Sequence, residues 1–109
     1  MHREVSTGDV FRSHVDLLLL AVVEREPAHG YRIVEALRER SSDAFDLGEG
    51  TIYPALHRLE REGLLRSRWQ TVDGRRRRIY RLTGGGKRAL ARRRDEWRTF
   101  AEAVGAVIA

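Results

Sequence analysis

The dipeptide Asp73-Gly74 lies between two short segments rich in strand-forming residues, 64–71 and 76–82. Asp-Gly favours the tight turn of a β-hairpin, because both central positions of that turn need positive φ angles. Elsewhere the chain carries apolar residues at helical spacing. A chain of 109 residues has room for one domain. The sequence therefore predicts a mainly helical (α+β) fold with one small β-hairpin.

Apolar periodicity predicts four helices in the rest of the chain. The first covers residues 10–26 and the second residues 29–40. The third runs from residue 51 to about 62, since Pro54 lacks a backbone N–H and is tolerated only in the first turn of a helix. The fourth covers residues 84–108. Helix, helix, helix and hairpin is the order of a winged helix-turn-helix, here with one long helix appended.

This order divides the chain into three parts. Residues 1–9 show no periodicity and are expected to form a flexible N-terminal arm, and residues 10–83 form the winged helix-turn-helix domain. Residues 84–109 are predicted to be a dimerisation helix, because apolar residues recur in it every seven positions. The first helix is apolar on two sides, and its second side is expected to meet another chain. The expected dimer interface comprises Leu17, Leu20, Leu90, Trp97, Phe100, Val104 and Val107.

Basic side chains are concentrated in the second half: residues 1–63 carry 8 basic and 12 acidic side chains, whereas residues 64–98 carry 13 basic and 3 acidic ones. Such segregated positive charge indicates a polyanionic partner. Four consecutive arginines follow the hairpin turn, and a phosphate backbone would relieve their mutual repulsion. Arg78 is expected to pack on the sheet or to pair with Glu60 or Glu62. The arginines predicted to contact DNA are Arg75, Arg76 and Arg77.

The third predicted helix has an apolar side and a polar side. Ile52, Leu56 and Leu59 recur at core-facing spacing. The opposite side carries small, hydrogen-bonding and basic residues, which suits entry into the major groove of DNA. The residues on that side are Thr51, Tyr53, Pro54, His57, Arg58 and Arg61.

Several functional classes lack support in the sequence. The chain has no cysteine, phosphate-binding loop or catalytic triad, so we expect no enzyme activity, no cofactor and no metal site. No apolar run approaches the ~20 residues of a membrane span, and no secretion signal is found, so the cytoplasm is the expected location. Two alternatives stay open: a sequence-indifferent nucleic-acid-binding protein, and a metal-responsive winged-helix sensor that uses His14, His29 or His57.

A set of motifs in one order resembles the PadR-type transcriptional regulators. The resemblance covers roughly residues 14–100. Because the chain stops directly after the long helix, it resembles the branch of the family with a short C-terminal helix. The motifs are His29-Gly30-Tyr31, the run from Gly50 to Glu60, Gly63-Leu64-Leu65, Trp69, the run from Gly74 to Thr83, and Gly86.

This resemblance implies a homodimer that binds an inverted-repeat operator in double-stranded DNA and usually represses transcription. It implies a phosphate contact for Tyr31, with half-buried packing as the alternative, and assigns Tyr80 to packing within the wing. It also implies that the third helix enters the major groove. The residues of that helix that would contact DNA are Thr51, Tyr53, Pro54, His57 and Arg58.

Multidrug-sensing relatives carry a tryptophan at the position of Trp97, where it stacks on flat aromatic ligands between the subunits. The resemblance therefore implies a small aromatic effector, and the alternative is that Trp97 only packs in the dimer core. Arg94 lies one turn before Trp97 and favours an anionic or neutral aromatic compound over a cation. The residues expected to line the effector site are Val15, Leu18, Leu19 and Trp97.

Overall fold

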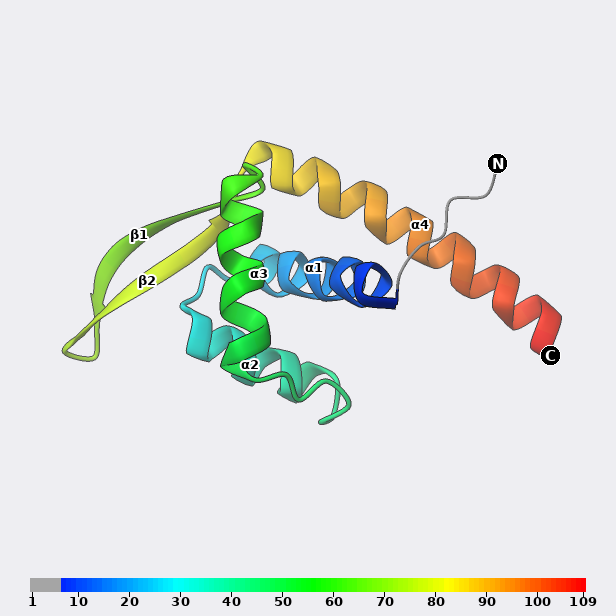
Figure 1. Ribbon diagram of the computed structural model, residues 1–109, viewed down its shortest axis with the longest axis horizontal. Coiled ribbons are helices and arrows are strands. Elements are labelled where there is room, and N and C mark those ends of the chain that lie inside the picture. Colours follow the sequence, from blue (N-terminus) through cyan, green and yellow to red (C-terminus); the bar gives the residue numbers. More distant parts are fainter. Residues whose placement is uncertain (1–6) are drawn as a thin grey trace.

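The computed structural model describes residues 7–109, with side chains from residue 12 onward. It is mainly helical, with a two-stranded antiparallel hairpin between the third and fourth helices (Figure 1). The predicted α+β fold and its order of elements are confirmed. The elements are α1 (Thr7–Arg25), α2 (Gly30–Arg40), α3 (Glu49–Arg61), β1 (Leu65–Val72), β2 (Arg75–Leu82) and α4 (Gly84–Ile108).

Two helices begin earlier than predicted. Helix α1 begins at Thr7, so residues 7–9 of the predicted arm are helical, while residues 1–6 lie outside the described residues. Helix α3 begins at Glu49, which places Pro54 beyond the first turn. Because proline cannot donate a hydrogen bond, the carbonyl of residue 50 lacks its usual helical partner at this point. Periodicity alone did not locate these starts, because neither helix opens on an apolar residue.

The hydrophobic core lies where α1, α2, α3, the base of the hairpin and the start of α4 meet. Helix α1 contacts the other three helices and β2, so most of its apolar residues are covered within one chain, whereas Leu17, predicted at the dimer interface, and Leu18 are only half-buried. This corrects three predictions. Leu20 and Leu90, expected in a dimer interface, and Leu19, expected at an effector site, are fully buried in this core.

The hairpin has the predicted turn. Asp73 and Gly74 have φ angles of 50° and 77°, as a two-residue turn of this type requires. Val72 pairs with Arg75 directly beside the turn. At the other end of the hairpin, the backbone of Tyr80 exchanges two hydrogen bonds with Ala28, at 3.1 and 2.9 Å. The wing is therefore attached to the segment between α1 and α2, and Tyr80 is buried at this attachment.

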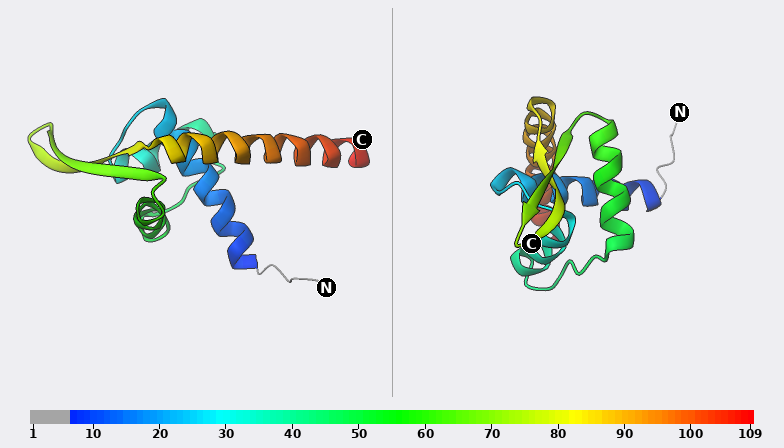
Figure 2. Two further views of the ribbon diagram at one scale, coloured as in Figure 1. Left: turned by 90° about the horizontal axis from the view of Figure 1, so that it is seen from above. Right: turned by 90° about the vertical axis from the view of Figure 1, so that its left-hand side faces the viewer.

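Helix α4 is anchored at its first turn and extends away from the core. The Thr83 hydroxyl accepts a hydrogen bond from the Gly86 N–H at 3.0 Å and donates one to the Gly63 carbonyl at 2.6 Å. A Cβ at position 86 would lie 2.1 Å from the Leu64 carbonyl oxygen, so only glycine fits there. The hairpin and the end of α4 project in opposite directions from the core of a molecule measuring 52 × 32 × 24 Å (Figures 1 and 2).

Candidate nucleic-acid interface

Helix α3 packs on α1 and α2 with one side and exposes the other (Figure 1). Ile52, Leu56 and Leu59 are fully buried, as predicted. Pro54 and His57 are exposed on the opposite side, one turn apart. Further exposed residues at helical spacing extend this side toward both ends of the helix. The exposed stripe of α3 comprises Gly50, Pro54, His57 and Arg61.

Tyr53 and Thr51 are half-buried at the edge of that stripe. The ring of Tyr53 lies on the backbone of Gly30, where an added Cβ would be 2.5 Å from Tyr53 Cε1. The start of α2 and the edge of the exposed side of α3 are therefore in contact. Tyr31, the next residue along α2, is 50% exposed and stacks against His29 with ring centroids 6.5 Å apart.

His29 is the N-cap of α2, because its Nδ1 accepts a hydrogen bond from the Arg32 N–H at 3.2 Å. An imidazole that accepts through Nδ1 must carry its proton on Nε2 and be neutral. Burial, and then the positive charge of Arg77 on the wing, lower the pKa of His29. The start of α2 is thus electrostatically linked to the wing.

Arg58, predicted to contact DNA, is engaged within the chain. Its side chain is only 23% exposed, and its Nη2 donates a hydrogen bond to Asp16 Oδ1. Arg58 Nε also lies 3.9 Å from Glu62 Oε1. The pair with Asp16 links α3 to α1, and the DNA contact of Arg58 stays a prediction. Asp16 was not singled out from the sequence, although an acidic residue between Val15 and Leu17 in an otherwise apolar stretch is the feature that would have identified it.

The wing separates its arginines onto two faces. Opposite residues of an antiparallel pair share a face, and the observed register places Arg76 and Arg78 on the face of Trp69. Their guanidinium carbons lie 5.9 and 5.8 Å from the Trp69 ring centroid, within cation–π range. Arg75 and Arg77 point to the other face.

Arg78 is neutralised as predicted, whereas the arginines nearer the tip are not. Its Nη2 lies 3.5 Å from Glu60 Oε1, and its Nε donates to the Ser67 hydroxyl at 2.6 Å. Within the described part of the chain, no carboxylate pairs with the remaining three arginines. These three, predicted to contact DNA, are Arg75, Arg76 and Arg77.

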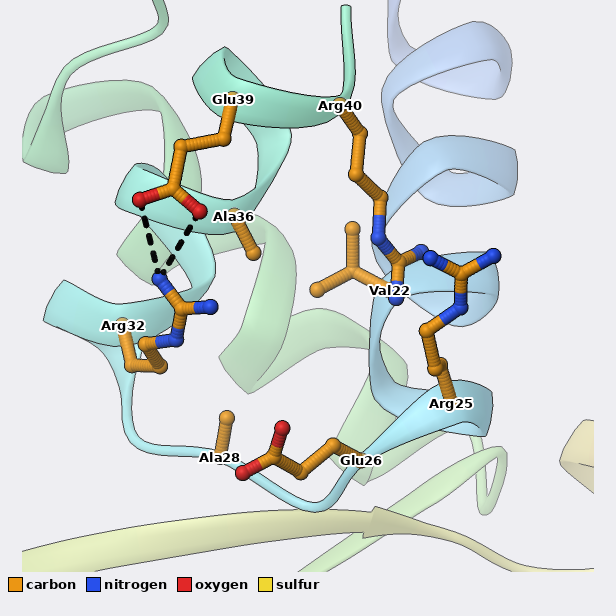
Figure 3. A pocket seen from close by; sticks show the side chains of 8 residues that line it. All are labelled: Val22, Arg25, Glu26, Ala28, Arg32, Ala36, Glu39 and Arg40. Atoms are coloured by element: carbon orange, nitrogen blue, oxygen red, sulfur yellow. Dashed lines mark hydrogen bonds and ion pairs between the residues drawn. The ribbon is translucent and has the colours of Figure 1, made fainter.

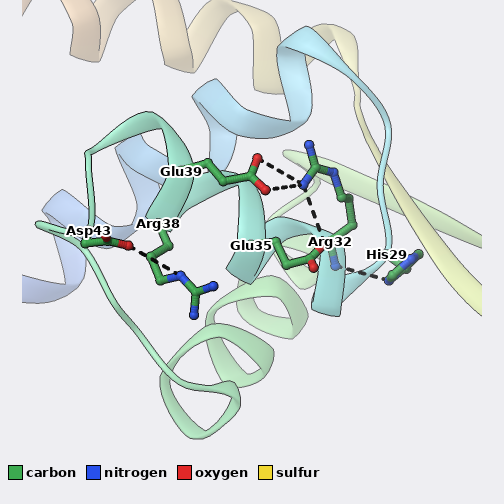
Figure 4. A network of polar contacts seen from close by, with 6 residues as sticks. All are labelled: His29, Arg32, Glu35, Arg38, Glu39 and Asp43. Carbon is green, nitrogen blue, oxygen red and sulfur yellow. Dashed lines mark hydrogen bonds and ion pairs between the residues drawn. The ribbon is translucent and has the colours of Figure 1, made fainter.

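Two arginines of α2, Arg32 and Arg38, are paired with carboxylates of the same region, and Arg40 donates to a backbone carbonyl. Arg32 Nη1 lies 3.3 Å from Glu39 and 3.5 Å from Glu35, and Arg38 Nε lies 3.5 Å from Asp43 (Figure 4). The three arginines at the wing tip thus differ from Arg32 and Arg38, because no carboxylate of the described chain pairs with them.

A shallow polar pocket lies between the end of α1 and α2. Arginine and glutamate side chains converge on it, and the ribbon of α3 passes behind it, so it opens away from the exposed side of α3 (Figure 3). Arg40 donates to the Ala21 carbonyl at 3.4 Å, and burial lowers its pKa. This pocket is therefore separate from the face formed by α3 and the wing. Its lining residues are Val22, Arg25, Glu26, Ala28, Arg32, Ala36, Glu39 and Arg40.

A second pocket, of about 480 Å³, is apolar and lies between α1, the α2–α3 loop and α4. It includes Val15, Leu18 and Trp97, which were predicted at an effector site, whereas Leu19 is absent from its lining. The loop residues Phe45 and Leu47 were missed, because no periodicity places a loop against a helix. The His14 ring stands edge-on to Trp97, with centroids 6.0 Å apart. The lining residues are His14, Val15, Leu17, Leu18, Phe45, Leu47, Arg94 and Trp97.

The distal half of α4 has an apolar surface that the described residues of this chain leave exposed. Val107 is 83% exposed, and the Trp97 and Phe100 rings contact each other with centroids 6.0 Å apart. Four residues predicted at the dimer interface are exposed in this half of the helix: Trp97, Phe100, Val104 and Val107.

In the part of the chain that the structure describes, no group of three or more His, Asp or Glu side chains could hold a metal ion. His14 instead contacts Trp97, and His29 caps α2. His57 lies on the exposed side of α3. None of the described helices is long and apolar enough to cross a membrane.

Three helices, a two-stranded wing and a long terminal helix define a winged helix-turn-helix transcriptional regulator. Solved structures agree. A transcriptional regulator from Clostridium thermocellum is 28% identical, with a TM-score of 0.79 over 89% of this chain and 95% of that chain. A PadR family transcription regulator from Clostridium difficile R20291 is 32% identical, with a TM-score of 0.77 over 88% of this chain and 99% of that chain.

The chain belongs to the Transcriptional regulator PadR-like family, whose model matches residues 19–92. The chain is also 39% identical to Transcriptional regulator Rv3488 of Mycobacterium tuberculosis over 93 residues, which cover 85% of this chain and 84% of that protein. Members of this family are transcriptional regulators rather than enzymes; they bind DNA and are generally dimeric.

Proposed function

We propose that this chain is a sequence-specific DNA-binding repressor that acts as a homodimer on an inverted-repeat operator, at the nucleoid in the cytoplasm. The observation that carries the proposal is the exposed side of α3 beside a wing whose tip arginines have no carboxylate partner in the described chain. A helix supplies hydrogen-bonding groups to base edges in the major groove, and arginines supply phosphate contacts. Pro54 and His57 lie on that side of α3, with Tyr53 at its edge.

The proposed dimer uses the apolar surface on the distal half of α4. A single helix that exposes Trp97, Phe100 and Val107 in water favours burial against a second apolar surface. Two copies related by a two-fold axis would present two α3 helices, and such symmetry matches an inverted repeat.

A competition assay tests this function. The full chain is used to select duplexes from a random library, and the selected duplex then competes with random duplex at fixed salt. We expect a preference of at least about a thousandfold for the selected duplex. Equal binding of the two duplexes would instead identify a sequence-indifferent nucleic-acid-binding protein.

We further propose a small anionic or neutral aromatic effector in the apolar pocket beside Trp97. The lining is apolar apart from His14 and Arg94, and Arg94 Nη2 is paired with Glu24 Oε1 at 2.9 Å. Such a pocket suits a flat ring, with the guanidinium near its rim.

Tryptophan fluorescence tests the effector site. The chain has two tryptophans, so Trp69→Phe leaves Trp97 as the sole emitter. We expect 2-naphthoate to quench this emission and to release DNA, and Arg94→Gln to weaken 2-naphthoate but not neutral 2-naphthol. No quenching by either compound would contradict the proposal.

A further inference from the structure

Asp16 is the one buried charged residue in the part of the chain described here, with 6% of its surface exposed. It lies in the middle of α1 between two apolar residues. Burial raises the pKa of its carboxyl above the ordinary value, although the guanidinium of Arg58 acts in the opposite direction. A carboxylate in such a place is costly unless cations hold it.

The two cations that face Asp16 come from different helices. Arg58 of α3 donates from Nη2 to Asp16 Oδ1, and Arg93 of α4 places Nη1 3.8 Å from Asp16 Oδ2. Arg93 Nη1 is buried and makes no hydrogen bond, so its interaction with the carboxylate is purely electrostatic. One carboxylate thus joins α3, which carries the proposed DNA-contacting face, to α4, which carries the proposed dimer surface.

Stability alone does not explain this arrangement. Replacing a buried ion pair by well-packed apolar residues is often neutral or stabilising, because the pair loses its hydration. Apolar contacts are non-directional, however, whereas a charged hydrogen bond fixes the relative positions of its donor and acceptor. The cluster of Asp16, Arg58 and Arg93 therefore fixes the geometry between helices that apolar packing leaves less defined.

We infer that Asp16 is a positioning residue for DNA recognition, which holds α3 at a fixed place relative to α4. The inference rests on the proposed function. In a dimer joined through α4, the position of α3 relative to α4 sets the distance and angle between the two α3 helices. Asp16 therefore determines which spacing between operator half-sites the dimer accepts.

The test uses Asp16→Asn, which keeps the shape of the side chain and removes its charge. Affinities of the full chain are measured for the selected operator, for the same operator with one or two base pairs added to or removed from its spacer, and for random duplex. We expect the preference for the native spacing to fall about tenfold or more. Binding to random duplex and the dimeric state should be unchanged.

A second variant and a control keep the result decisive. Arg93→Gln removes the contact to α4 without touching α3, and should flatten the spacing preference in the same direction. The control is Glu24→Gln, which breaks the exposed pair between α1 and α4 at 2.9 Å and should leave that preference intact. Should Asp16→Asn fail to fold, Arg93→Gln decides.

The outcomes separate this inference from the function on which it rests. Wild-type chain without any operator preference overturns both. If the wild-type chain has a sharp spacing preference and the folded Asp16→Asn and Arg93→Gln variants share it, only the positioning role is overturned. Equal flattening by Glu24→Gln also overturns it, because any weakened contact between α1 and α4 would then suffice.

Discussion

Through His29, the contribution of the start of α2 to the stability of the folded chain depends on pH. Its cap requires neutral imidazole, and its pKa in the folded chain is below the ordinary value of 6.5. As pH falls below 6.5, the unfolded chain therefore binds this proton first, and the folded state loses stability until the folded pKa is passed. Above 6.5 the contribution of His29 to stability is fully present.

The variant His29→Asn tests this dependence, because asparagine caps a helix without titrating. Thermal unfolding of both chains is compared at pH 7.5 and pH 5.5. We expect acidification to favour the variant relative to wild type, since only wild type must exclude a proton from position 29. His29→Ala should cost about 1 kcal/mol at pH 7.5 through loss of the cap. A wild-type-to-Asn difference that is identical at both pH values would contradict this role.

Gly30 is needed because Tyr53 occupies the space that a side chain would fill. We expect Gly30→Ala to displace the Tyr53 ring, to destabilise the chain by about 1–3 kcal/mol and to weaken operator binding. Gly84→Ala is the matched control, since its Cβ would meet only the end of Arg88 at 3.5 Å. Denaturant unfolding and operator titration measure both. Equal effects of the two changes would argue against the contact with Tyr53.

At the scale of elements, the two faces of the wing give different expectations for salt dependence. The slope of log affinity against log salt is negative, and each phosphate contact contributes about −0.9 to it. Replacing Arg75 and Arg77 by Gln should therefore make this slope shallower by about two. Arg78→Gln should change the slope less, since Arg78 is already paired with Glu60. Titrations between 50 and 200 mM salt measure both. An unchanged slope in the double variant would remove the wing from the interface.

Local chemistry determined most of what could be predicted at this scale. The hairpin turn, its register and the buried side of α3 follow from short-range rules that need only neighbouring residues. The links between elements do not: Asp16 meets Arg58 from 42 positions away, and Phe45 reaches the pocket of α1 from a loop. Periodicity also shows that α1 is apolar on two sides, but not whether one chain or two cover them.

At the scale of the whole molecule, the question is which apolar surface a second chain covers. Leu20 and Leu90 belong to the core of one chain, which leaves the distal half of α4 as the proposed interface. We expect Phe100→Glu to prevent dimerisation, since it places a charge in the uncovered apolar surface. Arg98→Glu is the control, as it lies roughly half a turn around the helix from Phe100 and changes the net charge more. Sedimentation at micromolar concentration measures the assembly state.

The same pair of variants connects assembly to recognition. A monomeric Phe100→Glu chain keeps its α3 and its wing, so it should bind one half-site as weakly as the wild-type chain does, and lose the gain from the inverted repeat. That gain comes from linking two binding events rather than from any new contact. Arg98→Glu should retain it. A Phe100→Glu chain that stays dimeric would place the interface elsewhere than on the distal half of α4.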